Sequence, residues 1–178
     1  MSFSKQKPTG AKTVTNTETY NRSRIALVLP QQPPFLFLDS AELNSETLTA
    51  TYTIKGDEFF LEGHFRNEPI FPASILFEAL GQAACLWVLE RGPRVLGRPI
   101  QSNQIFFASL DGAHVYRKTR PPERLLLEVK LTRFREPLAI FQGRVTTDGG
   151  DRVAQIDRLV LVFGEQLPPA EPSTTRVT

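Results

Sequence analysis

Two side chains of this sequence, His64 and Glu78, could together transfer protons, and they lie fourteen residues apart. His64 has aromatic residues on both sides, and an imidazole in an apolar wall stays mostly neutral near pH 7, as a general base must. Glu78 lies between Phe77 and Ala79, where burial favours the neutral carboxylic acid and therefore a role as general acid. Read singly, His64 could be a core histidine, and Glu78 could face a solvent slot or a subunit boundary.

The segment between these two residues supplies a third group. Residues 69–72 (Pro-Ile-Phe-Pro) read as extended, and a helix is expected to begin at Ala73. The first backbone N–H groups of a helix have no intrahelical partner and carry the positive end of the helix dipole. They suit a carbonyl oxygen that gains negative charge in a reaction. Gln82, one helical turn after Glu78, could hold the orientation of its carboxyl group.

The elements that must position these groups indicate an α+β domain. From Ala73 to about Glu90 apolar side chains cover nearly every face, which predicts a buried helix that Gly92-Pro93 ends. Strands are predicted over residues 35–39, 47–54, 100–108, 125–134, 138–146 and 153–163, with a turn at 147–151 and either a short helix or a strand at 25–29. His114 reads as a loop residue without a role. We expect a curved antiparallel sheet wrapped around one long buried helix.

Composition and charge exclude several classes of protein. The chain has 178 residues, 40% of them hydrophobic, which is enough for one globular domain with its own core. A formal net charge of +2 gives no argument for nucleic acid as a partner. The single cysteine, Cys85, cannot form an internal disulfide, which favours a reducing compartment. His64 and His114 show no metal-ligand spacing, so no metal site is expected.

The two ends of the chain differ from the middle. Residues 1–23 have almost no aliphatic side chains and are predicted to be a disordered arm, although Tyr20 could anchor its last part. Residues 166–178 are rich in Pro and Thr and are predicted to be a disordered tail. The folded domain is therefore expected over residues 24–165. No apolar run of signal-peptide or membrane-spanning length is seen, so a cytoplasmic location is expected.

Three segments resemble the FabZ-type 3-hydroxyacyl-carrier-protein dehydratases. Residues 29–36 (Leu-Pro-Gln-Gln-Pro-Pro-Phe-Leu) are similar to the Leu-Pro-His-Arg-Tyr-Pro-Phe-Leu opening of that family. Residues 63–73 (Gly-His-Phe-Arg-Asn-Glu-Pro-Ile-Phe-Pro-Ala) are similar to its Gly-His-Phe-Pro-x-x-Pro-Val-Met-Pro-Gly signature. Residues 78–82 (Glu-Ala-Leu-Gly-Gln) match its Glu-Ala-Met-Ala-Gln at the same spacing from the histidine. The resemblance covers roughly residues 24–163.

The resemblance implies a hotdog fold and a homodimer or a trimer of dimers. It implies an active site at the dimer interface, with the histidine from one chain and the glutamate from the other. In that site His64 would handle the C2 proton of a 3-hydroxyacyl thioester, Glu78 would protonate the departing hydroxyl, and the Ala73 N–H would polarise the thioester carbonyl. The substrate-binding residues would be Phe65, Phe71, Pro72, Ala73 and Gln82. No cofactor is implied, because the carrier supplies the phosphopantetheine arm.

The chain also departs from the family pattern. Ala73 replaces the signature glycine, which would strain the backbone if that position has a positive φ and matter little if it is helical. Arg66 replaces a proline, and the Gly-Asp of a downstream block is missing. These departures suggest a divergent member in a specialised lipid or polyketide pathway. Arg117, Lys118 and Arg120 survive from that block, either to steer an acidic acyl carrier protein or as a solvated strand edge.

Two other functions remain open at this stage. A hotdog thioesterase would activate water with a carboxylate near the helix start and would not need His64. A non-catalytic protein that binds acyl thioesters is the third reading, and the substitutions at Arg66 and Ala73 keep it open. The sequence leaves the acyl chain length open, and it does not decide between acyl carrier protein and coenzyme A as the thioester carrier.

Overall fold

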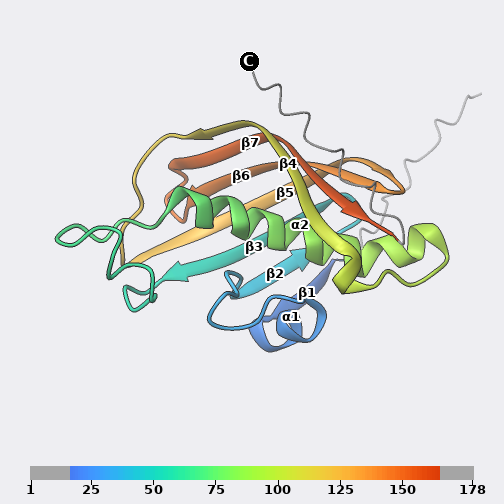
Figure 1. Cartoon of the computed structure of the whole chain (residues 1–178), viewed down its shortest axis with the longest axis horizontal. Helices are drawn as coiled ribbons and strands as arrows, with labels where there is room; N and C mark the ends of the chain where they lie inside the picture. Colours follow the sequence, from blue (N-terminus) through green and yellow to red (C-terminus); the bar gives the residue numbers. More distant parts are fainter. Residues whose placement is uncertain (1–16, 165–178) are drawn as a thin grey trace, which may run out of the picture.

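The computed structural model describes residues 17–164, and it shows one antiparallel sheet curved around a long helix (Figure 1). The elements in chain order are β1 (Glu18–Asn21), α1 (Arg22–Val28), β2 (Ser40–Leu43), β3 (Thr47–Ile54), α2 (Ala73–Leu96), a 3-10 turn (Ser102–Gln104), β4 (Ile105–Val115), β5 (Glu123–Arg135), β6 (Leu138–Thr147) and β7 (Arg152–Phe163). The predicted architecture, a sheet wrapped around one buried helix, is confirmed.

The sheet has the strand order β1-β2-β3-β5-β6-β7-β4, and all neighbours are antiparallel. Register shifts interrupt the pairing of β4 with β7, of β5 with β6 and of β6 with β7. Such bulges bend a strand and increase its local twist, which lets the sheet curl around α2. β4 lies at one end of the order, so within the described residues its second edge pairs with no strand.

The middle of α2 is enclosed, as the sequence predicts. Every residue from Ala79 to Val88 is buried. Gly81 faces Phe107 of β4, and a Cβ added at this glycine would lie 2.6 Å from the Phe107 ring. A side chain at position 81 would therefore push β4 away from the helix. The glycine serves close packing here, because it holds the edge strand against the helix that carries Glu78.

The predicted end of this helix is wrong. Gly92 and Pro93 lie inside α2, which continues to Leu96 and ends at Gly97 in the left-handed conformation with φ 70°. A Cβ at Gly92 would lie 2.5 Å from Ile100 Cδ1, so this glycine allows close packing and does not stop the helix. Pro93 lies in the last turn of α2, where it supplies no N–H to the helix while its carbonyl accepts from Gly97 N–H at 2.9 Å.

Four of the six strand predictions are confirmed, three with small changes in their ends. Residues 47–54 form β3 as predicted, and β5, β6 and β7 extend the strands expected in the second half. Residues 35–39 were wrongly predicted as a strand, because the Phe37 N–H bonds to the Gln82 side chain and to no neighbouring strand. The strand expected at 100–108 lies at 105–115 instead. It includes His114, which pairs with Gln155 and is not in a loop.

The predicted start of the domain at residue 24 also needs correction. Residues 18–21 form β1, which pairs with β2, and α1 follows directly. Tyr20 is 2% exposed, and its hydroxyl donates to Glu90 at 2.8 Å, which confirms the anchoring role considered for this residue. The disordered segments predicted at residues 1–16 and 165–178 lie outside the described residues.

A buried arginine joins β1 to the second half of α2. Arg91 donates to Glu18 Oε1 at 2.8 Å and to the carbonyl oxygens of Leu43 and Asn44 at 3.2 Å each. Its hydrogen bond holds the pKa of Glu18 at about 2, well below the ordinary 4.5, and Tyr20 adds to this effect. The first strand is thus fixed to the helix by a charge that stays ionised at neutral pH.

The stability of the domain should therefore fall in acid. A carboxyl group whose pKa is depressed on folding stabilises the fold above its unfolded pKa, and this stabilisation is lost as the pH falls through the folded pKa. We expect Glu18→Gln to lower the free energy of unfolding by about 1 kcal/mol at pH 7. The difference from wild type should shrink between pH 5 and pH 2 when both proteins are unfolded in urea. A difference that stays constant over this range would contradict the assignment.

One expectation about membranes needs refinement. By length and composition alone α2 could cross a bilayer, and it is the one helix of the described residues that passes this test. Of its most apolar stretch, 61% is buried inside the fold, as in the core helix of a soluble protein.

Candidate active site

The loop that carries His64 is built by short-range backbone hydrogen bonds. Ile70 N–H donates to His64 O at 2.8 Å, and Phe65 and Glu68 exchange two bonds of 2.8 and 3.0 Å. Phe71 N–H then donates to Thr119 O at 2.9 Å, which fixes the end of the loop to the connector between β4 and β5. The peptide bond between His64 and Phe65 is cis. These contacts hold the imidazole in one place ahead of α2.

The hydrogen bond of the imidazole defines its tautomer. His64 Nδ1 lies 2.8 Å from the carbonyl oxygen of Ile70. A carbonyl can only accept, so Nδ1 carries the proton and the neutral ring presents the lone pair of Nε2. The ring of Phe65 stacks on the imidazole at 4.0 Å between centroids and an interplanar angle of 28°. In this tautomer Nε2 is the ring nitrogen that can take up a proton, and the role of His64 as a base stays a prediction.

A pocket of about 370 Å³ lies beside His64 and reaches the start of α2. Its lining residues are His64, Ile70, Phe71, Ala73, Leu76, Val115, Tyr116, Arg117 and Lys118. Ala73 is the first residue of α2, and no hydrogen bond within residues 17–164 uses its N–H. No non-glycine residue described has a positive φ, so alanine at this position is unstrained. Ala73, with its unpaired N–H, and His64 therefore line the same pocket.

Glu78 is held by Gln82. Gln82 is fully buried, and its Nε2 donates to Glu78 Oε1 at 2.9 Å and to Phe35 O at 3.0 Å. Its Oε1 accepts from Phe37 N–H at 2.9 Å. Glu78 itself is half-buried, and only its Oε1 takes part in these bonds. Because Gln82 is buried and donates to Glu78, we infer that it is a positioning residue for Glu78, and its predicted contact with substrate stays a prediction.

Removing the amide of Gln82 should affect both stability and activity. In Gln82→Leu, Phe37 N–H and Phe35 O lose their partner, and an unsatisfied buried group costs about 1–3 kcal/mol. We expect about 3 kcal/mol lower free energy of unfolding and a lower kcat from the freed Glu78. Gln142→Leu is the matched control, because Gln142 is exposed on the outer face of β6. Equal unfolding midpoints for the two variants would contradict this role.

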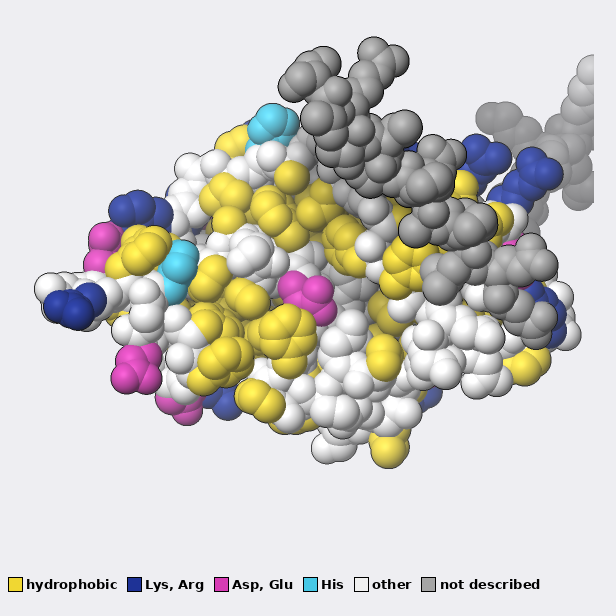
Figure 2. Space-filling model, viewed as in Figure 1, with side chains coloured by type: hydrophobic (Ala, Val, Ile, Leu, Met, Phe, Trp, Pro, Cys, Tyr) yellow, Lys and Arg dark blue, Asp and Glu magenta, His cyan; other side chains and the backbone are white. Residues whose placement is uncertain are grey.

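Within one chain the structure does not bring Glu78 into the pocket of His64. Ala73 and Leu76 of α2 line that pocket, and Glu78 does not. At 100° per residue, Glu78 lies roughly 160° around the helix from Leu76, so it points to another side of α2. Figure 2 shows hydrophobic side chains gathered on the face in view, with an acidic side chain among them and histidines at their border. Both residues of the predicted acid–base pair are present, but Glu78 does not line the pocket of His64 in this chain.

Phe65, Phe71 and Pro72, which are predicted to bind substrate, differ in their surroundings. Phe71 is 2% exposed and belongs to an aromatic cluster with Phe37 and Tyr52, while it also lines the pocket. Pro72 is buried as the residue before α2 and does not line the pocket. Phe65 is 53% exposed and stacks on His64 from outside. Of these three, Phe71 alone lines the pocket, and contact with substrate stays a prediction for all three.

Each of the three predicted basic residues, Arg117, Lys118 and Arg120, has an acidic partner. Arg117 pairs with Glu123, and Lys118 and Arg120 both pair with Glu68. Arg117 and Lys118 also line the pocket. Sequence reasoning missed the role of Glu68, because nothing in the spacing of residues 63–73 shows that this loop folds against the connector at 116–122. Docking of a carrier here stays a prediction.

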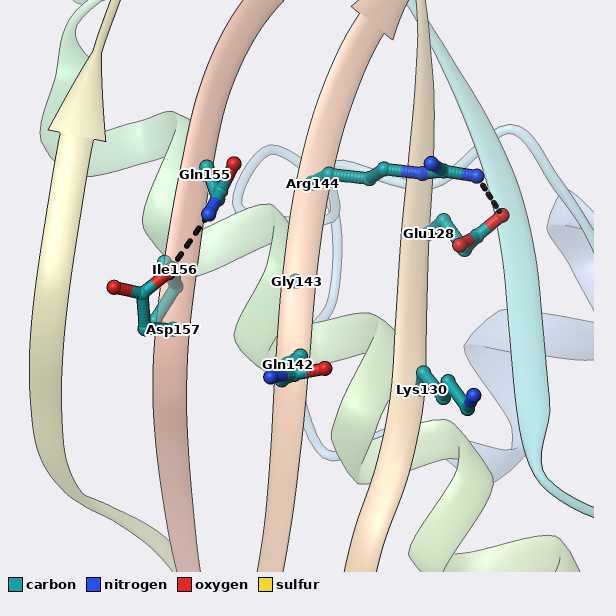
Figure 3. A pocket seen from close by; sticks show the side chains of 8 residues that line it. All are labelled: Glu128, Lys130, Gln142, Gly143, Arg144, Gln155, Ile156 and Asp157. Carbon is teal, nitrogen blue, oxygen red and sulfur yellow. Dashed lines mark hydrogen bonds and ion pairs between the residues drawn. The ribbon is translucent and has the colours of Figure 1, made fainter.

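A buried thiol and a second pocket are two further features of the described part. Burial, with the charge of Glu78 nearby, raises the pKa of the Cys85 thiol to about 12, so it is not a nucleophile at neutral pH. A second pocket of about 370 Å³ opens on the sheet face turned away from α2, between side chains of β5, β6 and β7 (Figure 3). Its charges are partly paired, as in Arg144 with Glu128 at 2.9 Å. Among residues 17–164 no cluster of His, Cys, Asp and Glu could hold a metal ion.

The chain is similar to known proteins over the same region. The model of the FabA-like domain family matches residues 29–157. The 3-hydroxyacyl-[acyl-carrier-protein] dehydratase FabZ of Tolumonas auensis is 33% identical over 130 residues, which is 70% of this chain and 83% of that protein. FabZ of Lactococcus lactis is 31% identical over 131 residues, 72% of this chain and 86% of its own length.

Solved structures show the same fold at low identity. The dehydratase heterocomplex ApeI:P from Xenorhabdus doucetiae has a TM-score of 0.65 and 14% identity, over 80% of this chain and 91% of that one. A hypothetical thioesterase from Streptococcus pneumoniae with coenzyme A has a TM-score of 0.52 and 10% identity, over 70% and 83% of the two chains. Identity this low shows the hotdog fold alone. The family model, however, spans His64, Ala73 and Glu78, and the chain belongs to the FabA-like domain family.

Proposed function

We propose that this protein is a 3-hydroxyacyl-thioester dehydratase, which reversibly removes water from a (3R)-hydroxyacyl thioester to give the trans-2-enoyl thioester. The observation that carries the proposal is the pocket that His64 and Ala73 line together, with His64 Nδ1 bonded to Ile70 O and the Ala73 N–H unpaired within the described residues. The curated FabZ relatives carry the same activity in their names. The pathway would be fatty-acid-like, or a specialised lipid or polyketide pathway.

The reaction can be written with this chain's own groups. His64 Nε2 takes the C2 proton of the substrate, and the electron pair of that C–H bond moves toward the thioester carbonyl. The Ala73 N–H donates to the carbonyl oxygen as it becomes negative, aided by the positive end of the α2 dipole. Collapse of the enolate forms the C2–C3 double bond, and the C3–O bond breaks as Glu78 protonates the leaving hydroxyl, so that water departs. Reversal of these steps hydrates the enoyl thioester.

The complete site requires a second chain, and we propose that this is a second copy in a homodimer. Glu78 has no place in its own chain's pocket, so a partner's Glu78 would complete it across a two-fold axis. The eleven-residue strand β4 offers an unpaired edge for such an axis within the described residues. Val115 and Tyr116, which line the pocket at the end of β4, are 46% and 45% exposed. A trimer of dimers is a further possibility of the family, and a heterocomplex is the state named for the Xenorhabdus relative.

The thioester would arrive on an acyl carrier protein or coenzyme A, and the carrier would supply the phosphopantetheine arm. The proposal needs no resident cofactor or metal. The exposed Lys118 and the half-exposed Arg120 at the pocket mouth are placed to meet an acidic carrier. A cytoplasmic location, where such carriers occur, is part of this proposal.

A direct assay separates the candidate functions. The purified protein is incubated with a 3-hydroxyacyl thioester of acyl carrier protein, and the products are followed by mass. Loss of one water from the intact thioester is the result expected of a dehydratase. Free thiol without enoyl product would identify a thioesterase, and binding with no chemistry would identify a non-catalytic acyl-thioester-binding protein. Either result would overturn the proposal.

A further inference from the structure

One carboxylate, Glu68, connects the loop of His64 to the basic connector between β4 and β5. Glu68 Oε1 lies 3.5 Å from Lys118 Nζ and forms a closer ion pair with Arg120. The hydrogen bond from Arg120 and the charge of Lys118 lower the pKa of Glu68, so it is ionised at neutral pH. All three side chains are about half exposed, at 47% for Glu68, 60% for Lys118 and 49% for Arg120. Water and a second protein can therefore reach this cluster.

The ion pairs of the Glu68 side chain are not needed to hold the loop of His64 in place. Its backbone is held by the two hydrogen bonds to Phe65, and the loop is held by the bonds from Ile70 to His64 and from Phe71 to Thr119. None of these uses the Glu68 side chain. Arg117 differs, because its partner Glu123 is only 18% exposed and Arg117 also donates to Lys118 O at 3.0 Å. Lys118 and Arg120 are thus the exchangeable cations among the three basic residues.

We propose that Glu68 is an internal competitor of the acyl carrier protein: its carboxylate occupies Lys118 and Arg120 in the free protein and gives them up to acidic side chains of the docking carrier. This inference rests on the proposed function, because it requires a carrier at the mouth of the His64 pocket. The ion pairs are exchanged on docking rather than newly formed, so the net gain in affinity is small. A small gain keeps the complex short-lived, which suits an enzyme that must release its product carrier.

The test compares carrier affinity in Glu68→Gln and wild type. The probe is a bacterial acyl carrier protein that carries a 3-hydroxyacyl group through an unreactive amide, and binding is measured by calorimetry. Because exposed ion pairs are weak, we expect the variant to bind about three- to tenfold more tightly, with a steeper loss of affinity as salt is added. Unchanged or weaker binding in Glu68→Gln would overturn the proposal.

A double-mutant cycle identifies the groups involved. In the background Lys118→Gln with Arg120→Gln the cations are gone, so Glu68→Gln should no longer change the affinity. Glu62→Gln is the matched control for net charge, since Glu62 is exposed in the same loop and has no ion pair with the described residues. If carrier affinity rose equally in the cation-free background, or in Glu62→Gln, the effect of Glu68→Gln would come from long-range charge alone. Either result would refute the competition for Lys118 and Arg120.

A carrier-free substrate separates this inference from the proposed function. With a 3-hydroxyacyl N-acetylcysteamine thioester, wild type and Glu68→Gln should dehydrate at rates within about twofold, because the backbone bonds of the loop remain. No dehydration by wild type would overturn the proposed function itself. A large loss of carrier-free activity in Glu68→Gln alone would instead make Glu68 a structural support of the His64 loop, and the competition would be wrong.

Discussion

In His64→Ala, kcat for dehydration is expected to fall by about a thousandfold, since a positioned general base contributes roughly 10²–10⁴ in rate. His64 lines the pocket, and its Nδ1 is bonded to Ile70 O. Nε2 is therefore the ring nitrogen that would take the substrate proton. The loop itself should persist, because the bond from Ile70 N–H uses the His64 carbonyl and not the ring. Initial rates with the carrier-free thioester measure the effect.

His114→Ala is the control for this experiment. His114 is the second histidine of the chain, and it is exposed on β4. Its removal should leave the carrier-free rate within about twofold of wild type, as is usual for exposed side chains away from a site. A His64→Ala protein that keeps its normal circular dichroism and more than a tenth of the wild-type rate would refute His64 as the base.

Glu78→Gln should lower kcat by a similar factor, about 10²–10⁴, because the amide cannot donate a proton to the leaving hydroxyl. The substitution keeps the size of the side chain and an oxygen that can accept from Gln82 Nε2, so the fold should be retained. Glu42→Gln, an exposed change on β2, should keep full activity. Equal rates for the two variants would show that Glu78 has no part in the chemistry.

Mixing the two inactive proteins tests where the site lies. If each site takes His64 from one chain and Glu78 from the other, a mixed dimer of His64→Ala and Glu78→Gln contains one intact site. Random exchange of subunits should then restore about a quarter of the wild-type activity. No recovery after subunit exchange, shown by mass, would place both residues in one chain and would contradict the placement of Glu78 in the partner's pocket.

The sequence predicted the fold, and it indicated His64 and Glu78 as candidate reacting groups, because these signals are local. The apolar run from Ala73 reads as a buried helix, the alternation over Thr47–Ile54 reads as a strand, and the spacing of His64 and Glu78 matches a known family. The tautomer of His64 could not be read, since it depends on a carbonyl six residues away that the loop brings to Nδ1.

The failures share a physical cause, which is that tertiary contacts overrode local preference. Gly92-Pro93 reads as a stop, yet the close approach of Ile100 requires a glycine inside the helix. Residues 35–39 read as a strand, but the buried amide of Gln82 bonds to Phe35 O and Phe37 N–H in place of a neighbouring strand. β1 was missed because Tyr20 and Glu18 are fixed by residues about seventy positions away, Glu90 and Arg91. A short stretch of sequence therefore never contains both residues of either contact.

If the proposed homodimer forms, the edge of β4 that pairs with no strand of the described residues also bears on how the chain survives before a partner covers it. A long strand with free N–H and C=O groups is a template for wrong pairing with any extended chain, and aggregation begins at such edges. The register shift between Phe107 and Ser109 interrupts the edge, and Asp111 adds a charge to it. These protections are modest for eleven residues. The yield of soluble protein should therefore depend more on how quickly a partner covers this edge than on the stability of the folded chain.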